Sequence, residues 1–123
     1  MKVQSYQELI VWQKAMELCI EVYKVTESYP KIETYGLIYQ TRKSAVSVPS
    51  NIAEGWARQH RAEFLQSLNI ALGSAAELET QLILANRMTF LSHPDLQRIN
   101  GMNIETMKML NAMIGNLRST RIG

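Results

Sequence analysis

A short basic cluster, Arg58-Gln59-His60-Arg61, offers the clearest chemistry in this sequence, and it follows Trp56 closely. Arginine and protonated histidine bind phosphate through charge-assisted hydrogen bonds, and a neighbouring aromatic ring can stack on an exposed base. The alternative is a solvated turn whose tryptophan packs on the end of the fold, because one short cluster is a small electrostatic footprint. The sequence leaves both interpretations open.

Arg42 and Lys43 form a second basic pair, and Glu77 and Glu79 are acidic residues in a later segment. These side chains are suited to an ion pair between helices, which would fix packing register more than it would add stability. Glu77 as a general base has no partner nucleophile, so a structural role is favoured. Together with the basic turn, the second basic pair completes the set of residues expected to contact nucleic acid: Arg58, Arg61, His60, Arg42 and Lys43.

The sequence lacks the patterns that would make this chain an enzyme. Di-metal centres in helical bundles need Glu-x-x-His pairs, and neither His60 nor His93 has a glutamate three positions before it. Cys19 lies on an apolar seam and is expected in the core. No phosphate-binding or dinucleotide-binding glycine motif occurs. We therefore predict no catalytic residue, no bound metal and no cofactor.

Composition sets the scale of the fold that must position these residues. The 123 residues are 46% hydrophobic and 20% charged, with a single cysteine and a net charge of +2. One domain spanning residues 1–123 is expected, and the mild positive charge permits a polyanionic partner without requiring one. No apolar leader and no run of about 20 apolar residues is visible, so we expect a cytoplasmic location and no membrane partner. Two further basic residues near the end are Arg118 and Arg121.

Helical periodicity predicts an all-α, antiparallel, up-and-down four-helix bundle, because short connections make successive helices antiparallel neighbours. The expected helices cover residues 5–28, 34–57, 61–88 and a last segment from 92 onward. Ser5 and Glu8 form a capping box for the first helix. Pro49 lies inside the second helix and predicts a kink near it, or else a break into two shorter helices. Three isolated glycines are expected at close helix contacts or bends: Gly36, Gly55 and Gly73.

The first helix is unusually apolar around its circumference. One heptad-spaced seam contains Leu9, Trp12, Met16, Cys19 and Tyr23, and the other contains Val11, Ala15, Leu18, Val22 and Val25. Together they cover an arc of about 200°, roughly twice what an ordinary surface helix buries. One seam can face the bundle, and the other needs a second cover, for which a neighbouring subunit is the simple candidate. The alternative is a helix buried deeply in its own bundle.

Several blocks of residues form a pattern that covers most of the chain. They are Leu9-Ile10-Val11-Trp12-Gln13-Lys14-Ala15, Tyr35-Gly36-Leu37, Asn51-Ile52-Ala53-Glu54-Gly55, Ile70-Ala71-Leu72-Gly73-Ser74 and Glu77-Leu78-Glu79-Thr80-Gln81-Leu82. The pattern resembles that of the small proteins encoded in 23S rRNA intervening sequences. Two positions depart from it, because His60 stands where Ser or Thr is usual and Thr89 where Gly is usual. Both departures weaken the expected ends of the third helix.

The resemblance implies a four-helix bundle that assembles into a ring-like homopentamer. It also implies kinship with accessory proteins of diversity-generating retroelements, whose proposed partners are nucleic acid and a reverse transcriptase. We therefore expect a non-enzymatic oligomeric accessory protein that binds structured RNA, such as ribosomal RNA, through basic residues presented by the ring. The alternative is a scaffold that docks another protein and does not contact nucleic acid.

Overall fold

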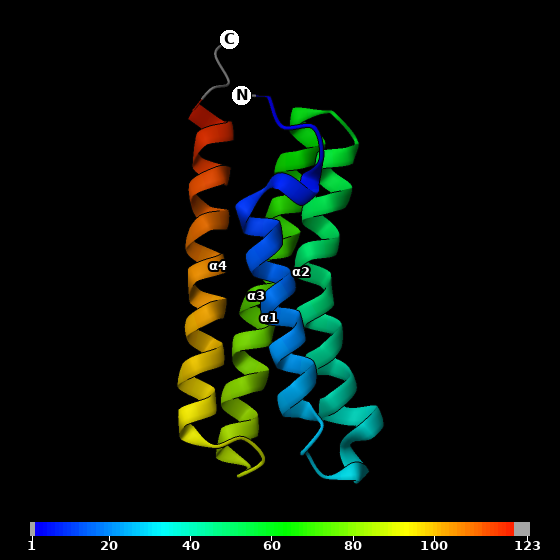
Figure 1. Cartoon of the computed structure of the whole chain (residues 1–123), viewed down its shortest axis with the longest axis vertical. Helices are drawn as coiled ribbons and strands as arrows, with labels where there is room; N and C mark the ends of the chain where they lie inside the picture. Colours follow the sequence, from blue (N-terminus) through cyan, green and yellow to red (C-terminus); the bar gives the residue numbers. More distant parts are fainter. Residues whose placement is uncertain (1, 120–123) are drawn as a thin grey trace.

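Four long helices of alternating direction make up the computed structural model, which describes residues 2–119. The helices are α1 (Ile10–Thr26), α2 (Tyr39–Ala57), α3 (Arg61–Arg87) and α4 (His93–Ser119). The α2–α3 turn lies at one end of the bundle, called the upper end here, and the α1–α2 and α3–α4 connections lie at the other, the lower end (Figure 1). Each helix contacts the helix before it, and α4 closes against α1. The predicted up-and-down four-helix bundle is confirmed.

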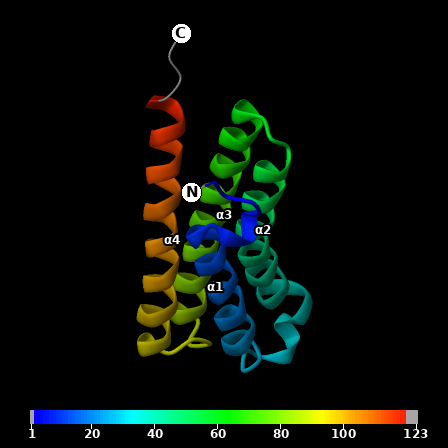
Figure 2. The same cartoon turned by 45° about the horizontal axis from the view of Figure 1, so that its top comes forward.

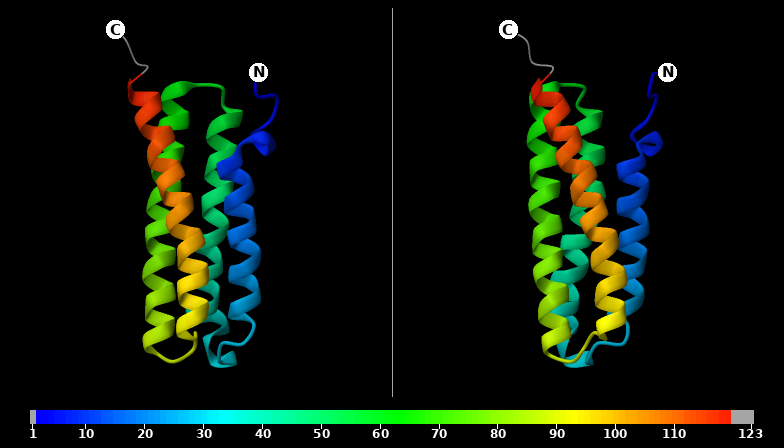
Figure 3. Two further views of the ribbon diagram at one scale, coloured as in Figure 1. Left: turned by 60° about the vertical axis from the view of Figure 1, so that its left-hand side comes forward. Right: turned by 90° about the vertical axis from the view of Figure 1, so that its left-hand side faces the viewer.

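The core runs the full length of the bundle between the four helices (Figure 3). On α1, the inward face is the predicted seam of Val11, Ala15, Leu18, Val22 and Val25, all of which are buried. On α3, buried residues recur at alternating spacings of three and four, as the helical period requires: Leu68, Ala71, Ala75, Leu78, Leu82 and Ala85. Helical periodicity therefore located the core face of both helices.

The start of α1 differs from the prediction. A 3₁₀ turn, η1 (Tyr6–Glu8), comes first, and α1 begins only at Ile10 because Leu9 between them is extended. Ser5 Oγ accepts a hydrogen bond from the Gln7 amide at 3.1 Å, so it caps the 3₁₀ turn rather than an α-helix. Glu8 Oε1 accepts from the Gln4 amide at 3.3 Å, one residue earlier than a capping box requires.

Aromatic packing accounts for this early turn. The ring centroid of Tyr6 lies 5.5 Å from that of Trp12 on α1 and 6.3 Å from that of Trp56 near the end of α2, both edge-on. Edge-on aromatic pairs at this spacing are favourable. Figure 2 shows the N-terminal segment folded over the upper part of α1 beside α2. Contacts from outside the helix therefore set its beginning.

Pro49 lies inside α2, which continues through it, so the alternative of two shorter helices is wrong. Proline has no N–H to donate to the carbonyl of Ala45, and this missing bond is the cause of the kink predicted near it. The Cys19 thiol of α1 donates to that carbonyl, with Sγ 2.9 Å from the Ala45 oxygen. Burial raises the pKa of Cys19 to about 12, which keeps the thiol protonated and able to donate. Cys19 is thus a core residue, as expected, and also the partner of the freed carbonyl.

The predicted second helix begins irregularly. After a 3₁₀ turn, η2 (Lys31–Glu33), the chain forms a bent helical segment, η3 (Thr34–Ile38), which is interrupted by non-helical angles at Gly36 (φ −105°, ψ −112°). The Glu33 carboxylate accepts from the Leu37 amide at 2.9 Å, and a Cβ on Gly36 would lie 2.8 Å from that carboxylate. Gly36 therefore marks a bend, as predicted, and regular α2 starts only at Tyr39.

Both ends of α3 lack the residue usually found there. At its start, His60 makes no side-chain capping bond within the described chain. At its end, Thr89 takes a left-handed φ of 65°. Its amide donates to the Asn86 carbonyl at 3.0 Å, and the Phe90 amide donates to the Ala85 carbonyl at 2.8 Å. These are the two bonds of a Schellman motif, in which glycine normally takes the left-handed position. The two sequence departures therefore have the structural effects expected of them.

Close packing of α2 on α3 depends on one of the predicted glycines. A Cβ on Gly55 would lie 2.5 Å from the Cβ of Ser67, a distance that would force the helices apart. Further along the same contact, the hydroxyl oxygens of Ser47 and Ser74 are 2.7 Å apart and hydrogen-bonded. Gly73 has no described atom within 4 Å of its Cβ position, so the close-contact interpretation does not hold there.

Candidate nucleic-acid interface

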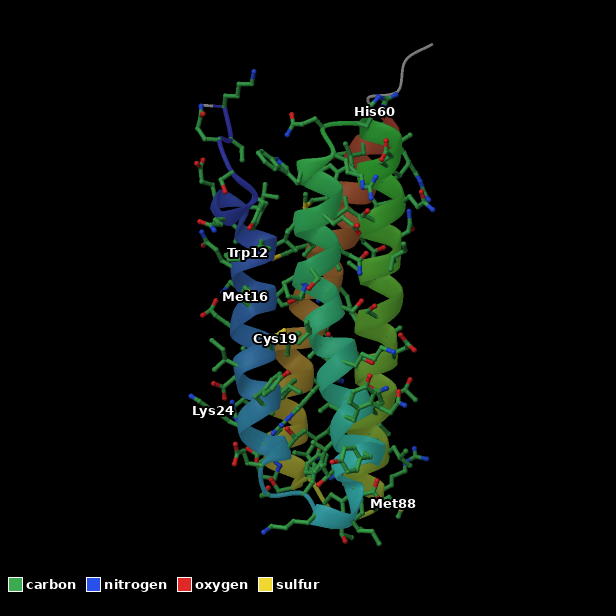
Figure 4. The ribbon with its side chains drawn as sticks, turned by 90° about the vertical axis from the view of Figure 1, so that its right-hand side faces the viewer. Trp12, Met16, Cys19, Lys24, His60 and Met88 are labelled. Atoms are coloured by element: carbon green, nitrogen blue, oxygen red, sulfur yellow. The ribbon has the colours of Figure 1, made fainter. Side chains whose placement is uncertain are left out.

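The five residues expected to contact nucleic acid lie at two ends of the bundle. Arg58, His60 and Arg61 surround the α2–α3 turn, and Figure 4 shows His60 at the upper end. Arg42 and Lys43 lie on the first turns of α2, near the lower end. Sixteen positions of helix separate Arg42 from Arg58, which corresponds to about 24 Å. One bundle thus presents two separate basic regions rather than one.

At the upper end, Arg58 is engaged by acidic neighbours. Its guanidinium nitrogens lie 3.4 Å from the Glu54 carboxylate and 3.2 Å from the Glu63 carboxylate. The hydrogen bond that Arg58 donates to Glu54, followed by the one it donates to Glu63, raises the pKa of Arg58. Its charge is balanced by these two carboxylates, so Arg58 braces the turn between α2 and α3. This weakens its expected role as a phosphate contact.

Two other arginines at the upper end share a hollow. Arg61 from the start of α3 and Arg118 from the end of α4 line a cavity of about 390 Å³ together with His60. Within residues 2–119, neither arginine forms an ion pair, and none of the described lining residues is acidic. The floor is aliphatic, from Leu65 and Leu117. We call this cavity the upper hollow; Arg121, the other late arginine, lies outside the described residues.

Trp56 partly fulfils both interpretations of the basic turn. Its ring is half-buried against Tyr6, as the packed alternative requires. It also lines a smaller hollow of about 270 Å³ that adjoins the upper hollow and shares His60 and Arg61 with it. The tryptophan is therefore held rigidly beside the basic side chains.

Near the lower end, Arg42 does not form the ion pair that the sequence suggested. Its Nε donates to Thr26 Oγ1 at 2.8 Å, and its Nη2 donates to the Tyr23 carbonyl at 3.2 Å. Glu77 is exposed on α3, and Glu79 accepts instead from the Asn100 amide at 3.0 Å. Arg42 thus closes the last turn of α1, where the Tyr23 carbonyl also accepts from Thr26 Oγ1 at 3.1 Å.

A cluster of tyrosines beside Arg42 was missed by the sequence interpretation. Tyr23, Tyr35 and Tyr39 line a surface hollow of about 450 Å³ together with Arg42 and Lys43. The guanidinium of Arg42 lies 4.5 Å from the centre of the Tyr23 ring, and Lys43 Nζ lies 5.9 Å from that of Tyr39. The available signal was the spacing of Tyr35, Tyr39 and Lys43, each four residues apart, which would place them on one face of the helix predicted over residues 34–57. We call this cavity the lower hollow.

The outer face of α1 is the other exposed feature, and Figure 4 looks onto it, with Trp12, Met16 and Cys19 following one another down the helix. Met16 is 37% exposed, Ile20 is 53% exposed, and Val46 on the adjacent α2 is 41% exposed. These three residues, the apolar band, are left uncovered by the described part of the chain. Deep burial of the whole helix in its own bundle is therefore wrong.

The opposite flank of α1, facing α4, is polar and closed by ion pairs. Glu21 lies 2.6 Å from Arg98, and the hydrogen bond from Arg98 lowers the pKa of Glu21. Lys14 lies 3.5 Å from Glu105 higher on the same flank. The apolar band therefore lies on the α2 side of α1, where a single further partner could cover it.

The described residues contain neither a cluster of metal ligands nor a membrane-spanning helix. Among residues 2–119, no three His, Cys, Asp or Glu side chains gather where they could hold a metal ion. No helix in that range is long and apolar enough to cross a membrane.

Comparison with known proteins gives two findings. Residues 7–112 match the family of the 23S rRNA-intervening sequence protein. A crystal structure of a protein of unknown function from the S23 ribosomal protein family of Bacteroides thetaiotaomicron is similar, with 30% sequence identity and a TM-score of 0.77. The alignment covers 85% of this chain and 98% of that one. No curated protein matches the chain.

Proposed function

This chain belongs to the family of the 23S rRNA-intervening sequence protein, and from that premise we propose that it is a non-enzymatic, self-associating accessory protein that binds structured RNA. The observation that supports the proposal is the upper hollow, where Arg61, Arg118 and His60 converge without an acidic neighbour among the described lining residues. Convergent cations without counter-charges are what a phosphate backbone requires.

The upper hollow suits RNA because two helix ends hold its cations in place. Arg61 stands on the first turn of α3 and Arg118 on the last turn of α4, so the distance between them is set by the bundle. Arginine binds phosphate in a planar, two-pronged geometry that rewards such fixed positions. Arg58, which is tied to Glu54 and Glu63, holds the turn in shape beside them.

The observation that supports self-association is the apolar band of Met16, Ile20 and Val46. Exposed apolar side chains on adjacent helices are costly in water and mark contact surfaces. Burial against a second copy would remove that cost, and repetition around a closed ring would bring several upper hollows together. A homopentamer, implied by the family resemblance, would multiply weak phosphate contacts through their effective concentration.

RNA retention tests the proposal. Fluorescence anisotropy with a labelled fragment of 23S rRNA should show binding at low salt that weakens steeply as salt rises. In the double variant Arg61→Gln, Arg118→Gln, the slope of log affinity against log salt should become shallower by about 1.5, because two phosphate contacts are lost. The double variant Arg87→Gln, Lys108→Gln removes the same charge from exposed positions elsewhere and should bind nearly as the native protein does.

Absence of binding at micromolar protein in low salt would remove the RNA proposal. Equal losses in both double variants would show that net charge alone acts, without a site. In either case, the second candidate is a scaffold that docks a protein, for which the apolar band is the specific observation. A pull-down that recovers a protein partner, lost in Ile20→Glu, would support that candidate.

Light scattering tests self-association directly. The native chain should be an oligomer, and Ile20→Glu should dissociate it because a charge would be buried at the contact. Ile104→Glu changes a 38% exposed isoleucine on α4 and should leave the oligomer intact. A native chain that is monomeric at micromolar concentration would contradict this part of the proposal.

A further inference from the structure

We infer that the lower hollow binds an unstacked base of an RNA loop or bulge, with Tyr35 and Tyr39 as stacking surfaces and Lys43 as the contact to the neighbouring phosphate. The inference rests on the proposed RNA binding and adds to it a second site with different chemistry. Protein recognition of RNA mainly targets loops and bulges, whose bases are free to stack on aromatic side chains.

Exposed aromatic rings support this inference most strongly. Three of the five tyrosines of the chain line this single hollow. Tyr35 is 91% exposed, Tyr39 is 51% exposed and Tyr23 is 43% exposed. Such rings contribute little to the core. Within the chain, Arg42 lies over Tyr23 and Lys43 over Tyr39, whereas Tyr35 is almost fully exposed. A base stacked on them would cover the exposed faces.

The backbone holds Tyr35 in an unusual place. It belongs to the bent segment η3, in which the Glu33 carboxylate accepts a hydrogen bond from the Leu37 amide at 2.9 Å. The bend at Gly36 directly follows Tyr35 and separates it from the regular helix that carries Tyr39. The two rings therefore reach the hollow from two differently directed segments.

Charge in the lower hollow fits a nucleotide. Its lining contains Arg42 and Lys43, and none of the described lining residues is acidic. Arg42 is fixed by Thr26 and Tyr23, so it contributes a stationary positive charge. Lys43 is exposed and takes part in no ion pair within residues 2–119, so its ammonium can follow a phosphate. Rings and cations side by side match the base and phosphate of one nucleotide.

The lower hollow borders the apolar band, because Val46 belongs to both, but a second copy of the chain suits this hollow less well than it suits Met16 and Ile20. The band consists of aliphatic and thioether side chains, whose burial requires only another apolar surface. In the lower hollow, a copy would also have to neutralise Arg42 and Lys43. An RNA phosphate brings that negative charge with it, so the observations favour RNA.

Two RNAs with the same stem test the inference: a labelled stem-loop and its blunt-ended duplex. Tyr35→Leu should weaken stem-loop binding about 5- to 150-fold, the range that corresponds to the loss of one stacking ring. Duplex binding should not change, and the salt slope for the stem-loop should stay the same because no phosphate contact is lost. Tyr35→Trp should restore the affinity. Ile32→Ala removes an equally exposed side chain, at 90%, outside the lining and should have no effect.

Each result separates this inference from the proposal beneath it. If the native protein binds the stem-loop and Tyr35→Leu binds it equally well, the stacking site is wrong while RNA binding stands. If the native protein binds neither RNA, the proposed function fails and the inference fails with it. If Tyr35→Leu changes the oligomer observed by light scattering instead of the RNA affinity, the hollow is a subunit contact and the inference is overturned.

Discussion

The two ends of α2 use their basic residues in the same way. At the upper end, Arg58 binds two carboxylates, while Arg61 forms no ion pair within the described chain. At the lower end, Arg42 binds the last turn of α1, while Lys43 is exposed. At each end, therefore, one basic side chain stabilises the fold and another remains accessible. The two ends differ in surroundings, because aliphatic residues floor the upper hollow and tyrosines line the lower one. A count of basic residues does not show this division, which depends on the neighbours that each side chain meets.

A substitution at the close contact between α2 and α3 near the upper end should cause the largest loss of stability. Gly55→Ala places a methyl group 2.5 Å from the Cβ of Ser67, so α2 and α3 must separate. We expect a loss of about 3 kcal/mol in the free energy of unfolding, measured by urea denaturation. Gly73→Ala faces open space on α3 and should instead gain up to about 1 kcal/mol from helix propensity. Equal effects of the two substitutions would contradict the close contact at Gly55.

At the lower end, replacing Arg42 should lower the stability of the fold, whereas replacing its neighbour Lys43 should not. Arg42→Ala removes the hydrogen bonds to Thr26 and to the Tyr23 carbonyl and should cost about 2 kcal/mol in urea denaturation. Lys43→Ala should leave stability almost unchanged, because the side chain is exposed. A reversed order would show that Arg42 is the available cation and Lys43 the structural one.

The hydrogen bond from Cys19 on α1 to the Ala45 carbonyl on α2 provides a test of pH dependence that involves neither end of the bundle. In the unfolded chain a thiol has a pKa of about 8.5, whereas burial raises the pKa of Cys19 to about 12. The thiol's contribution to stability is therefore complete below the lower value and is lost as pH rises through this window. We expect the free energy of unfolding to fall by about 1 to 2 kcal/mol between pH 8 and 10.

Cys19→Ala supplies the control for that measurement. It should lower stability at every pH, because the Ala45 carbonyl loses its donor, and it should remove most of the fall below pH 10. Burial, with the nearby Asp95, also raises the pKa of Tyr29 to about 12, and its effect begins only above its usual value of about 10. An unchanged alkaline fall in Cys19→Ala would assign the pH dependence to another group.

The smallest expected effect lies at the end of α3. Thr89→Gly relieves a left-handed φ of 65° at a β-branched residue and should add about 0.5 to 1 kcal/mol, seen as a higher midpoint of thermal unfolding. At the other end of the same helix, His60→Thr should gain a similar amount by adding a capping hydroxyl. A loss of stability in Thr89→Gly would mean that the threonine side chain makes a compensating contact.

Local sequence signals located most of the fold. The spacing of Val11, Ala15 and Leu18 placed the core face of α1, and Pro49 and Gly36 marked the irregular points of α2. The start of α1 could not be found this way, because Tyr6 packs on side chains from two different helices. Similarly, nothing local to Arg42 pointed to Thr26 as its partner, sixteen residues earlier in the chain.

The sequence by itself determined the class of the fold and showed which basic residues the chain carries near its predicted helix ends, because periodicity, caps and charge are local properties. The tertiary structure decided which of those residues are available. Only the folded chain brings Glu63 to Arg58, Arg118 to Arg61 and the tyrosines to Lys43. The physical reason is that an ion pair, a hollow or an exposed ring depends on distances between helices, and packing sets these distances.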